Sequence, residues 1–177
     1  AENGVPLAEL SRETIALLLD KGADPNKSFV GQMHSSTMCC DTSANASPFF
    51  RAAIAADVEA LKLLLAHGAD VEWSPSNVDG GRRGVNDNVG RTPLMMAMKG
   101  GRGLPLSAGP GFVRAGDPPF RELSNRSPSA AVRVLLDAGA NVNAAAANGA
   151  TALHHAVDTR DLEALRALLE HGAALDA

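Results

Sequence analysis

One short stretch of the sequence carries the residue types best suited to hold a soft metal ion. It contains Met33, His34, Met38 and the adjacent pair Cys39 and Cys40. Thioether, imidazole and thiolate groups are the ligands that Cu(I) and zinc prefer. The spacing matches no zinc motif, so packed methionines and plain thiols are the favoured interpretation. A metal site and a strained disulfide between the two cysteines are the alternatives. We predict no metal and no cofactor.

No motif typical of a catalytic site appears elsewhere in the sequence. There is no G-x-S-x-G, no Cys–His signature and no HExxH. The acidic pair Asp57 and Glu59 stands in the first turn of a predicted helix, where carboxylates offset the helix dipole. Asp161 and Glu163 repeat this arrangement. The prediction is that the chain is not an enzyme.

One phrase recurs four times, and it reads as the end of a helix followed by a turn. The copies are IALLLDKGADPN from Ile15, LKLLLAHGADVE from Leu61, VRVLLDAGANVN from Val132 and LRALLEHGAALD from Leu165. The apolar residues of each copy fall in one stripe, as in an amphipathic helix. The glycine of each copy stands where a helix C-cap requires a left-handed residue. We predict four helices that end at these glycines.

A second phrase precedes three of the copies and predicts the start of another helix. It reads SPFFRAA from Ser47, TPLMMAM from Thr92 and TALHHAV from Thr151. Ser or Thr caps a helix start, and Pro fits the first helical position. The distance from Gly139 to Gly172 is 33 residues, which is the period of the ankyrin repeat.

The chain therefore resembles the ankyrin-repeat family, and bacterial members in particular, over nearly its whole length. The resemblance implies an all-α solenoid of about four repeats, the first and last atypical, with β-hairpin fingers between repeats. We divide a single domain, 1–177, into repeats at about 1–41, 42–86, 87–145 and 146–177. The resemblance also implies a protein-binding scaffold, and it gives His154 a structural hydrogen bond to a neighbouring loop.

Three insertions distinguish the chain from a regular array. The hairpins after Gly22 and Gly68 are 13 and 12 residues longer than the one after Gly139. A further 26 residues separate the two helices of the third repeat. These segments are rich in Gly, Pro, Ser and Asn, which is typical of loops. We predict two elongated β-hairpin fingers and one long inter-helix insertion.

The ends of the array are also irregular. Pro6 stands where the inner helix of the first repeat belongs, so we expect a single helix there, from Pro6 to about Lys21. In the third repeat, Ser127 or Ser129 should cap an outer helix that starts near Ala130. The last repeat is not followed by a polar capping repeat. Our hypothesis is a segment of a longer polypeptide; the alternative is a complete chain whose end is covered.

Apolar residues of the recurring phrase are expected to pack between repeats. Each contributes about 1.5–3 kcal/mol when it is fully buried. These residues are Leu17, Leu18, Leu63, Leu64, Val134, Leu135, Leu168 and Leu169.

Charge and hydropathy narrow the choice of partner. The formal net charge is −4, and a nucleic-acid partner requires a basic face, so we expect no nucleic acid. No run reaches the ~18 apolar residues of a membrane-spanning helix, so we expect no membrane insertion. The expected partner is a protein, with other segments of the same longer polypeptide as an alternative. The compartment, cytoplasmic or exported, stays open.

The resemblance and the long fingers together predict a binding surface. Its candidate residues are Trp73, Arg82, Arg83, Asn88, Arg91, Lys99, Ile54 and Asp158. Trp and Arg are enriched at interface hot spots; the alternatives are that Trp73 holds the second finger on the stack and that Arg82 and Arg83 are solvated. The predicted function is protein–protein interaction. The alternatives are an accessory domain or subunit of an enzyme, and a small-ligand or metal pocket under the long loops.

Overall fold

The computed structural model describes residues 7–28, 46–75, 90–99 and 128–175. Seven helices lie in these ranges: α1 (Leu7–Asp20), α2 (Pro48–Ala55), α3 (Val58–Ala66), α4 (Pro93–Lys99), α5 (Pro128–Asp137), α6 (Ala152–Thr159) and α7 (Leu162–Glu170). Within the same ranges the backbone forms no strand, and an isolated antiparallel bridge joins Ala145 and Thr151. The predicted long fingers and the inter-helix insertion fall mainly on residues 29–45, 76–89 and 100–127, outside the described part.

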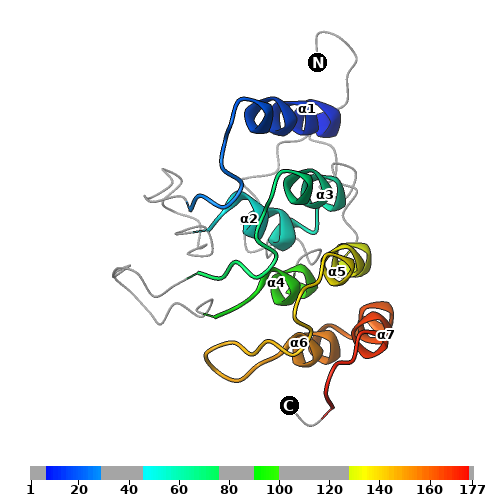
Figure 1. Ribbon diagram of the computed structural model, residues 1–177. Helices are drawn as coiled ribbons and strands as arrows, with labels where there is room; N and C mark the ends of the chain where they lie inside the picture. Colours follow the sequence, from blue (N-terminus) through cyan, green and yellow to red (C-terminus); the bar gives the residue numbers. More distant parts are fainter. Residues whose placement is uncertain (1–6, 29–45, 76–89, 100–127, 176–177) are drawn as a thin grey trace, which may run out of the picture.

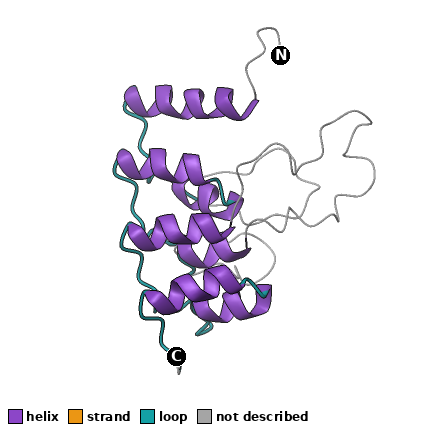
Figure 2. Cartoon of the chain, turned by 90° about the vertical axis from the view of Figure 1, so that its right-hand side faces the viewer, coloured by secondary structure: helices purple, strands orange, loops and turns teal. Residues whose placement is uncertain are grey.

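The helices form two layers that run the length of the stack (Figure 1). One layer contains α2, α4 and α6, which we call the inner helices, and the other contains the outer helices α1, α3, α5 and α7. Each inner helix contacts its own outer helix, and α4 also contacts the inner helices on either side of it, α2 and α6. Four successive units result: α1 alone, α2 with α3, α4 with α5, and α6 with α7. Figure 2 shows the units stacked one below the other. The all-α repeat fold predicted from the sequence is confirmed.

Helix starts follow the predicted capping chemistry at most positions. The hydroxyl of Ser47 accepts a 3.1 Å hydrogen bond from the backbone N–H of Phe50, and Asp57 accepts one from Ala60 at the start of α3. Helix α5 begins at Pro128, two residues before the expected start near Ala130, so Ser129 lies inside the first turn and does not cap the helix, while Ser127 lies outside the described residues. Pro is favourable at the first helical position. An N–H group there would have no acceptor within the helix, so proline loses no hydrogen bond by lacking one.

Helix ends are closed in the same way in all four units. The glycine φ angles are between 83° and 90° at positions 22, 68, 139 and 172. In the second unit, Ala69 N–H donates to the Leu64 carbonyl and Gly68 N–H to the Leu65 carbonyl, each at 3.0 Å. These two bonds define a Schellman motif, and the other three units form it with equivalent residues. The four helix ends predicted from the recurring phrase are therefore confirmed.

The core lies between the two layers and between successive units. Phe49, Leu61, Met95, Leu135 and Leu168 are fully buried in it. Many of the remaining core positions are alanines, so the helices approach one another closely. Because one pair of helices cannot bury its apolar face alone, the stability of the stack depends on contacts between neighbouring units.

Burial of the predicted packing residues depends on the unit in which they lie. Leu64, Leu135 and Leu168 are buried, as expected. Leu18 occupies the same repeat position but is 55% exposed, and Leu17 is 58% exposed. The prediction fails for both residues because no inner helix accompanies α1 in the described part of the first unit. It also fails for Leu169, which is 42% exposed because α7 is the last described outer helix.

Candidate binding surface

A hydrogen-bonded clamp links the turn of each unit to the next. The side chain of Asn26 donates to the Gly68 carbonyl at 2.9 Å and accepts from the Asp70 N–H at 2.7 Å. Asn143 forms the same pair of bonds with Gly172 (3.2 Å) and Ala174 (2.8 Å). Both asparagines stand four residues after the turn glycine. The clamp fixes the spacing of successive turns, from which the hairpin loops emerge.

The middle unit uses a different side chain at the clamp position. Glu72 accepts a 2.7 Å hydrogen bond from the backbone N–H of Asn141. An ionised carboxylate has no hydrogen to donate, so the second bond of the clamp does not form. The sequence analysis did not predict this network. The sequence does contain a signal for it, because the phrases GADPN and GANVN both end in the clamp asparagine, Asn26 and Asn143.

Trp73 packs against the inner layer where the second hairpin begins. Its ring lies over Phe50 of α2, with ring centroids 5.1 Å apart and planes tilted by 60°. Ala46, Met96 and Ile54 complete this small cluster. Trp73 and Ile54 are only partly buried. They therefore combine a packing role with surface that a partner is able to reach.

The loop between α5 and α6 and the end of α6 form the best exposed part of the predicted surface. The bond from the Ala146 N–H to the Ala150 carbonyl (2.9 Å) closes the loop, and Ala147 and Asn148 are exposed at its tip. Asp158 is exposed near the end of α6. Gly90 lies directly against the loop: a Cβ atom there would stand 3.0 Å from the backbone nitrogen of Ala147.

Arg91 lies in a different environment from the one its sequence position suggested. The residue is 7% exposed, and its Nε and Nη1 atoms have no hydrogen-bond partner within the described ranges. A buried charged group without partners is destabilising. Arg91 is thus a buried cation in this structure rather than an open contact residue.

The remaining candidates are not described at the level of side chains. Arg82, Arg83 and Asn88 lie in residues 76–89, outside the described part. Lys99 ends α4, but its side chain is not described. Cys39 and Cys40, with the neighbouring methionines, likewise lie outside the described residues.

Histidines occupy structural positions at helix ends. In His67 the Nδ1–H donates to the Leu63 carbonyl (2.9 Å), and the Nε2 atom lies 3.5 Å from a carboxylate oxygen of Asp20 in the preceding unit. His171 repeats the bond with Ala167 (2.8 Å). Both residues are the C-caps of their helices, α3 and α7.

The expected role of His154 needs correction. Its Nδ1 atom accepts a 3.3 Å bond from the Thr151 N–H and lies 2.9 Å from the Thr151 hydroxyl. The ring therefore closes onto the start of its own helix rather than onto a neighbouring loop. The physical reason is local: the N–H and hydroxyl groups of Thr151, three residues earlier at the start of α6, lie within hydrogen-bond distance of the ring.

Two features of the described residues concern metal ligation and membrane insertion. They contain no group of three or more His, Cys, Asp or Glu side chains placed to hold a metal ion. Among the same residues no helix has the length and apolar character required to cross a membrane.

Comparison with known families decides the nature of the C-terminal units. Residues 123–177, which include α5, α6 and α7, match the family model of ankyrin repeats (3 copies). This C-terminal segment contains ankyrin repeats. A comparison with curated proteins gave no match. Ankyrin repeats generally act as protein–protein interaction modules rather than as enzymes, and this property points to a protein partner.

Proposed function

We propose that the chain is a protein–protein interaction module that binds its partner through the inner-helix face and the hairpin loops. The ankyrin repeats at residues 123–177 carry this proposal. We infer that the array extends through α1–α4, because the Schellman closure recurs in all four units and at least one clamp bond joins each pair of consecutive turns. A partner would then meet one continuous surface built from several units.

The physical basis of the proposal is a rigid framework that presents exposed side chains. The clamps of Asn26, Glu72 and Asn143 join consecutive turns. Asp158 and the loop tip at Asn148 project from this framework. Groups that are already fixed in position lose little conformational entropy on binding, which favours affinity.

The proposed contact residues fall into two groups. Asp158, Ile54 and Trp73 lie on the described inner layer or at the root of a hairpin. Arg82, Arg83, Asn88 and Lys99 extend the proposed surface along the second finger and α4. Arg91 is proposed to contact the partner only if the surrounding chain opens.

Partner capture from an extract of the source organism tests the proposal. We expect Asp158→Lys and Trp73→Ala to reduce the yield of the captured partner. The control is Glu170→Lys, which changes the charge by the same amount at an exposed position of the outer helix α7 and should leave the yield unchanged. A partner captured equally by all variants would place the binding site elsewhere.

A further inference from the structure

The two ends of the outer layer present apolar side chains to solvent. Leu17 and Leu18 of α1 are 58% and 55% exposed, and Leu169 of α7 is 42% exposed. Figure 1 places α1 and α7 at opposite ends of the stack. Contacts at these ends are independent of the function proposed for the inner-helix face.

The third residue before each turn glycine faces the following unit. Leu19 and Leu136 occupy this position and are only 8% and 5% exposed, and Leu65 is partly buried. A described unit follows each of these three leucines. Leu169 occupies the same position in the last described unit and is the most exposed of the four. Its exposed surface is therefore the surface on which a further unit would pack.

The fourth residue before each turn glycine does not require a following unit for its burial. Leu168 is fully buried, as is Leu135, and Leu64 is 3% exposed. A described unit precedes each of them, and no described unit follows Leu168. Leu18 occupies this position in the first unit, which has neither a preceding unit nor an inner helix in the described part. Its side chain is therefore available to a body that packs on α1 from outside the stack.

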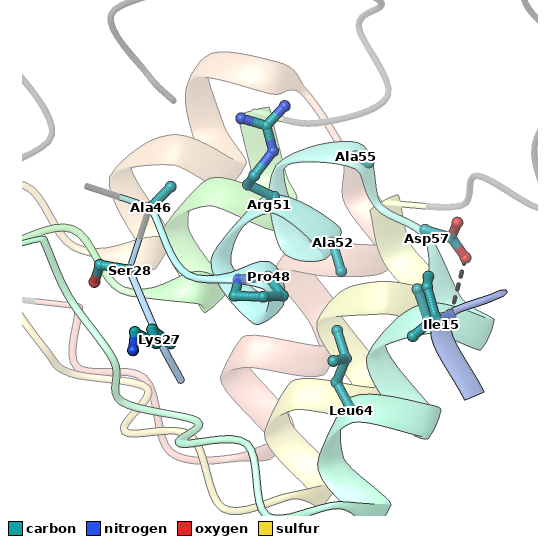
Figure 3. A pocket seen from close by; sticks show the side chains of 11 residues that line it. Ile15, Lys27, Ser28, Ala46, Pro48, Arg51, Ala52, Ala55, Asp57 and Leu64 are labelled. Atoms are coloured by element: carbon teal, nitrogen blue, oxygen red, sulfur yellow. Dashed lines mark hydrogen bonds between the residues drawn. The ribbon is translucent and has the colours of Figure 1, made fainter. Parts of the chain in front are cut away.

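The exposed leucines of α1 lie apart from the contact between α1 and the second unit. Figure 3 shows Ile15 of α1 at the groove between α1 and the α2–α3 pair, together with Pro48 and Leu64. Leu17 and Leu18 do not line this groove. A body that covers them would therefore extend the outer layer without displacing α2 or α3.

Contacts between basic and acidic side chains join consecutive units of the outer layer. The Nε2 atom of His67 lies 3.5 Å from a carboxylate oxygen of Asp20, and that of His171 lies 3.9 Å from one of Asp137. Each histidine directly precedes its turn glycine, and each aspartate stands two residues before the glycine of the preceding unit. The two positions therefore define a charge register from one unit to the next.

The same register is complementary between the two ends of the chain. Glu170 stands two residues before Gly172, and Lys21 directly precedes Gly22. Both side chains are exposed, and neither has an ion-pair partner within the described ranges. A first unit that followed α7 in the spacing of the stack would place Lys21 beside Glu170.

We propose that copies of this chain associate head to tail, with α1 of one copy packed on α7 of another. Helices α1, α3, α5 and α7 contact one another in succession, and α1 of the second copy continues this series by one step. Leu18 then packs toward Leu169, and Lys21 pairs with Glu170. The contact joins two different surfaces, so it is heterologous and leaves one free end on each copy.

The proposed contact is small, because it covers the outer layer alone. Small interfaces of this kind bind weakly, and we expect a dissociation constant between about 10 µM and 1 mM. The chain is then a monomer below about 1 µM.

Sedimentation equilibrium of the full chain tests the contact. The average mass should rise with concentration across this range. Leu18→Gln and Leu169→Gln should each weaken association at least about tenfold, because an amide without a partner is buried at the contact. Both leucines are exposed in the single chain, so the variants should fold, which circular dichroism verifies. Arg133→Glu, an exposed change on α5 away from both ends, should leave association unchanged.

Mixing the two Gln variants distinguishes a head-to-tail contact from other arrangements. The mixture retains one unaltered contact, between α7 of the Leu18→Gln chain and α1 of the Leu169→Gln chain. With a different fluorophore on each variant, we expect binding of wild-type affinity and complexes that stop at two chains. Self-association of either variant at wild-type strength, or no binding in the mixture, would overturn the proposal.

Charge reversal tests the register of the two copies. Lys21→Glu and Glu170→Lys should each weaken association by about two- to fivefold, since like charges then face each other. The double variant should recover the wild-type affinity. The proposal fails if the double variant shows no recovery. It also fails if the wild-type chain stays monomeric at about 1 mM, because the two ends would then not recognise each other.

Discussion

Glu72 accepts a 2.7 Å hydrogen bond from the backbone N–H of Asn141. This contact joins the turns of two units 69 residues apart in sequence. In the other two described clamps an asparagine makes the equivalent bond and donates a second one to the turn glycine. The array therefore holds one half-formed clamp between two complete ones.

Replacing Glu72 by Asn is expected to complete the middle clamp. The new amide gains a donor for the Gly139 carbonyl, so the free energy of unfolding should rise by about 0.5–1 kcal/mol. Urea denaturation measures this change. As a reciprocal control, Asn143→Asp removes the donor to Gly172 and should lower the free energy of unfolding by a similar amount. A decrease for Glu72→Asn would contradict the clamp assignment.

Gly90→Ala is expected to be more destabilising than a change at another left-handed glycine. Left-handed backbone costs an alanine about 1–2 kcal/mol, and at Gly90 the new Cβ also meets the Ala147 backbone at 3.0 Å. Gly149→Ala is the matched control, since its φ is 80° and no atom lies within 4 Å of the new Cβ. Thermal unfolding should give a lower midpoint for Gly90→Ala, and equal midpoints would argue against the close approach of the loop.

The same substitution at equivalent positions of two units tests whether the apolar side chain of Leu18 in the first unit is exposed in solution. Leu64→Ala should cost about 2–5 kcal/mol, because it removes a buried side chain. Leu18→Ala should change the free energy of unfolding by less than about 1 kcal/mol, because the side chain is already exposed. Chemical denaturation of both variants decides the matter. An equally large loss for Leu18→Ala would mean that the apolar surface of α1 is covered in solution.

Arg91→Met is expected to keep or increase stability. The guanidinium is buried, with two nitrogens lacking partners in the described ranges, and a methionine of similar length avoids the cost of desolvating a charge. The free energy of unfolding should stay the same or rise by about 1 kcal/mol. A substantial loss of stability would show that Arg91 is paired in solution.

The recurring phrase predicted local structure well because the determinants are local. The turn glycines, the Ser47 cap and the apolar stripes each act within a few residues, and the structure places them as expected. Burial was less predictable, because Leu18 and Leu64 have the same local sequence context but different neighbours. Arg91 shows the same limit: its repeat position indicates the inner surface, whereas its exposure depends on contacts made in three dimensions.

Site-specific photo-crosslinking provides the most direct test of the binding-module account. Benzoylphenylalanine is placed at Asp158 or Asn148 on the proposed surface, and at Arg133 or Glu170 on the outer helices as controls; all four positions are exposed. After irradiation in an extract of the source organism, the account predicts that one and the same protein crosslinks from Asp158 and Asn148 but not from Arg133 or Glu170. Crosslinking from the outer helices alone, or from none of the four positions, would contradict it.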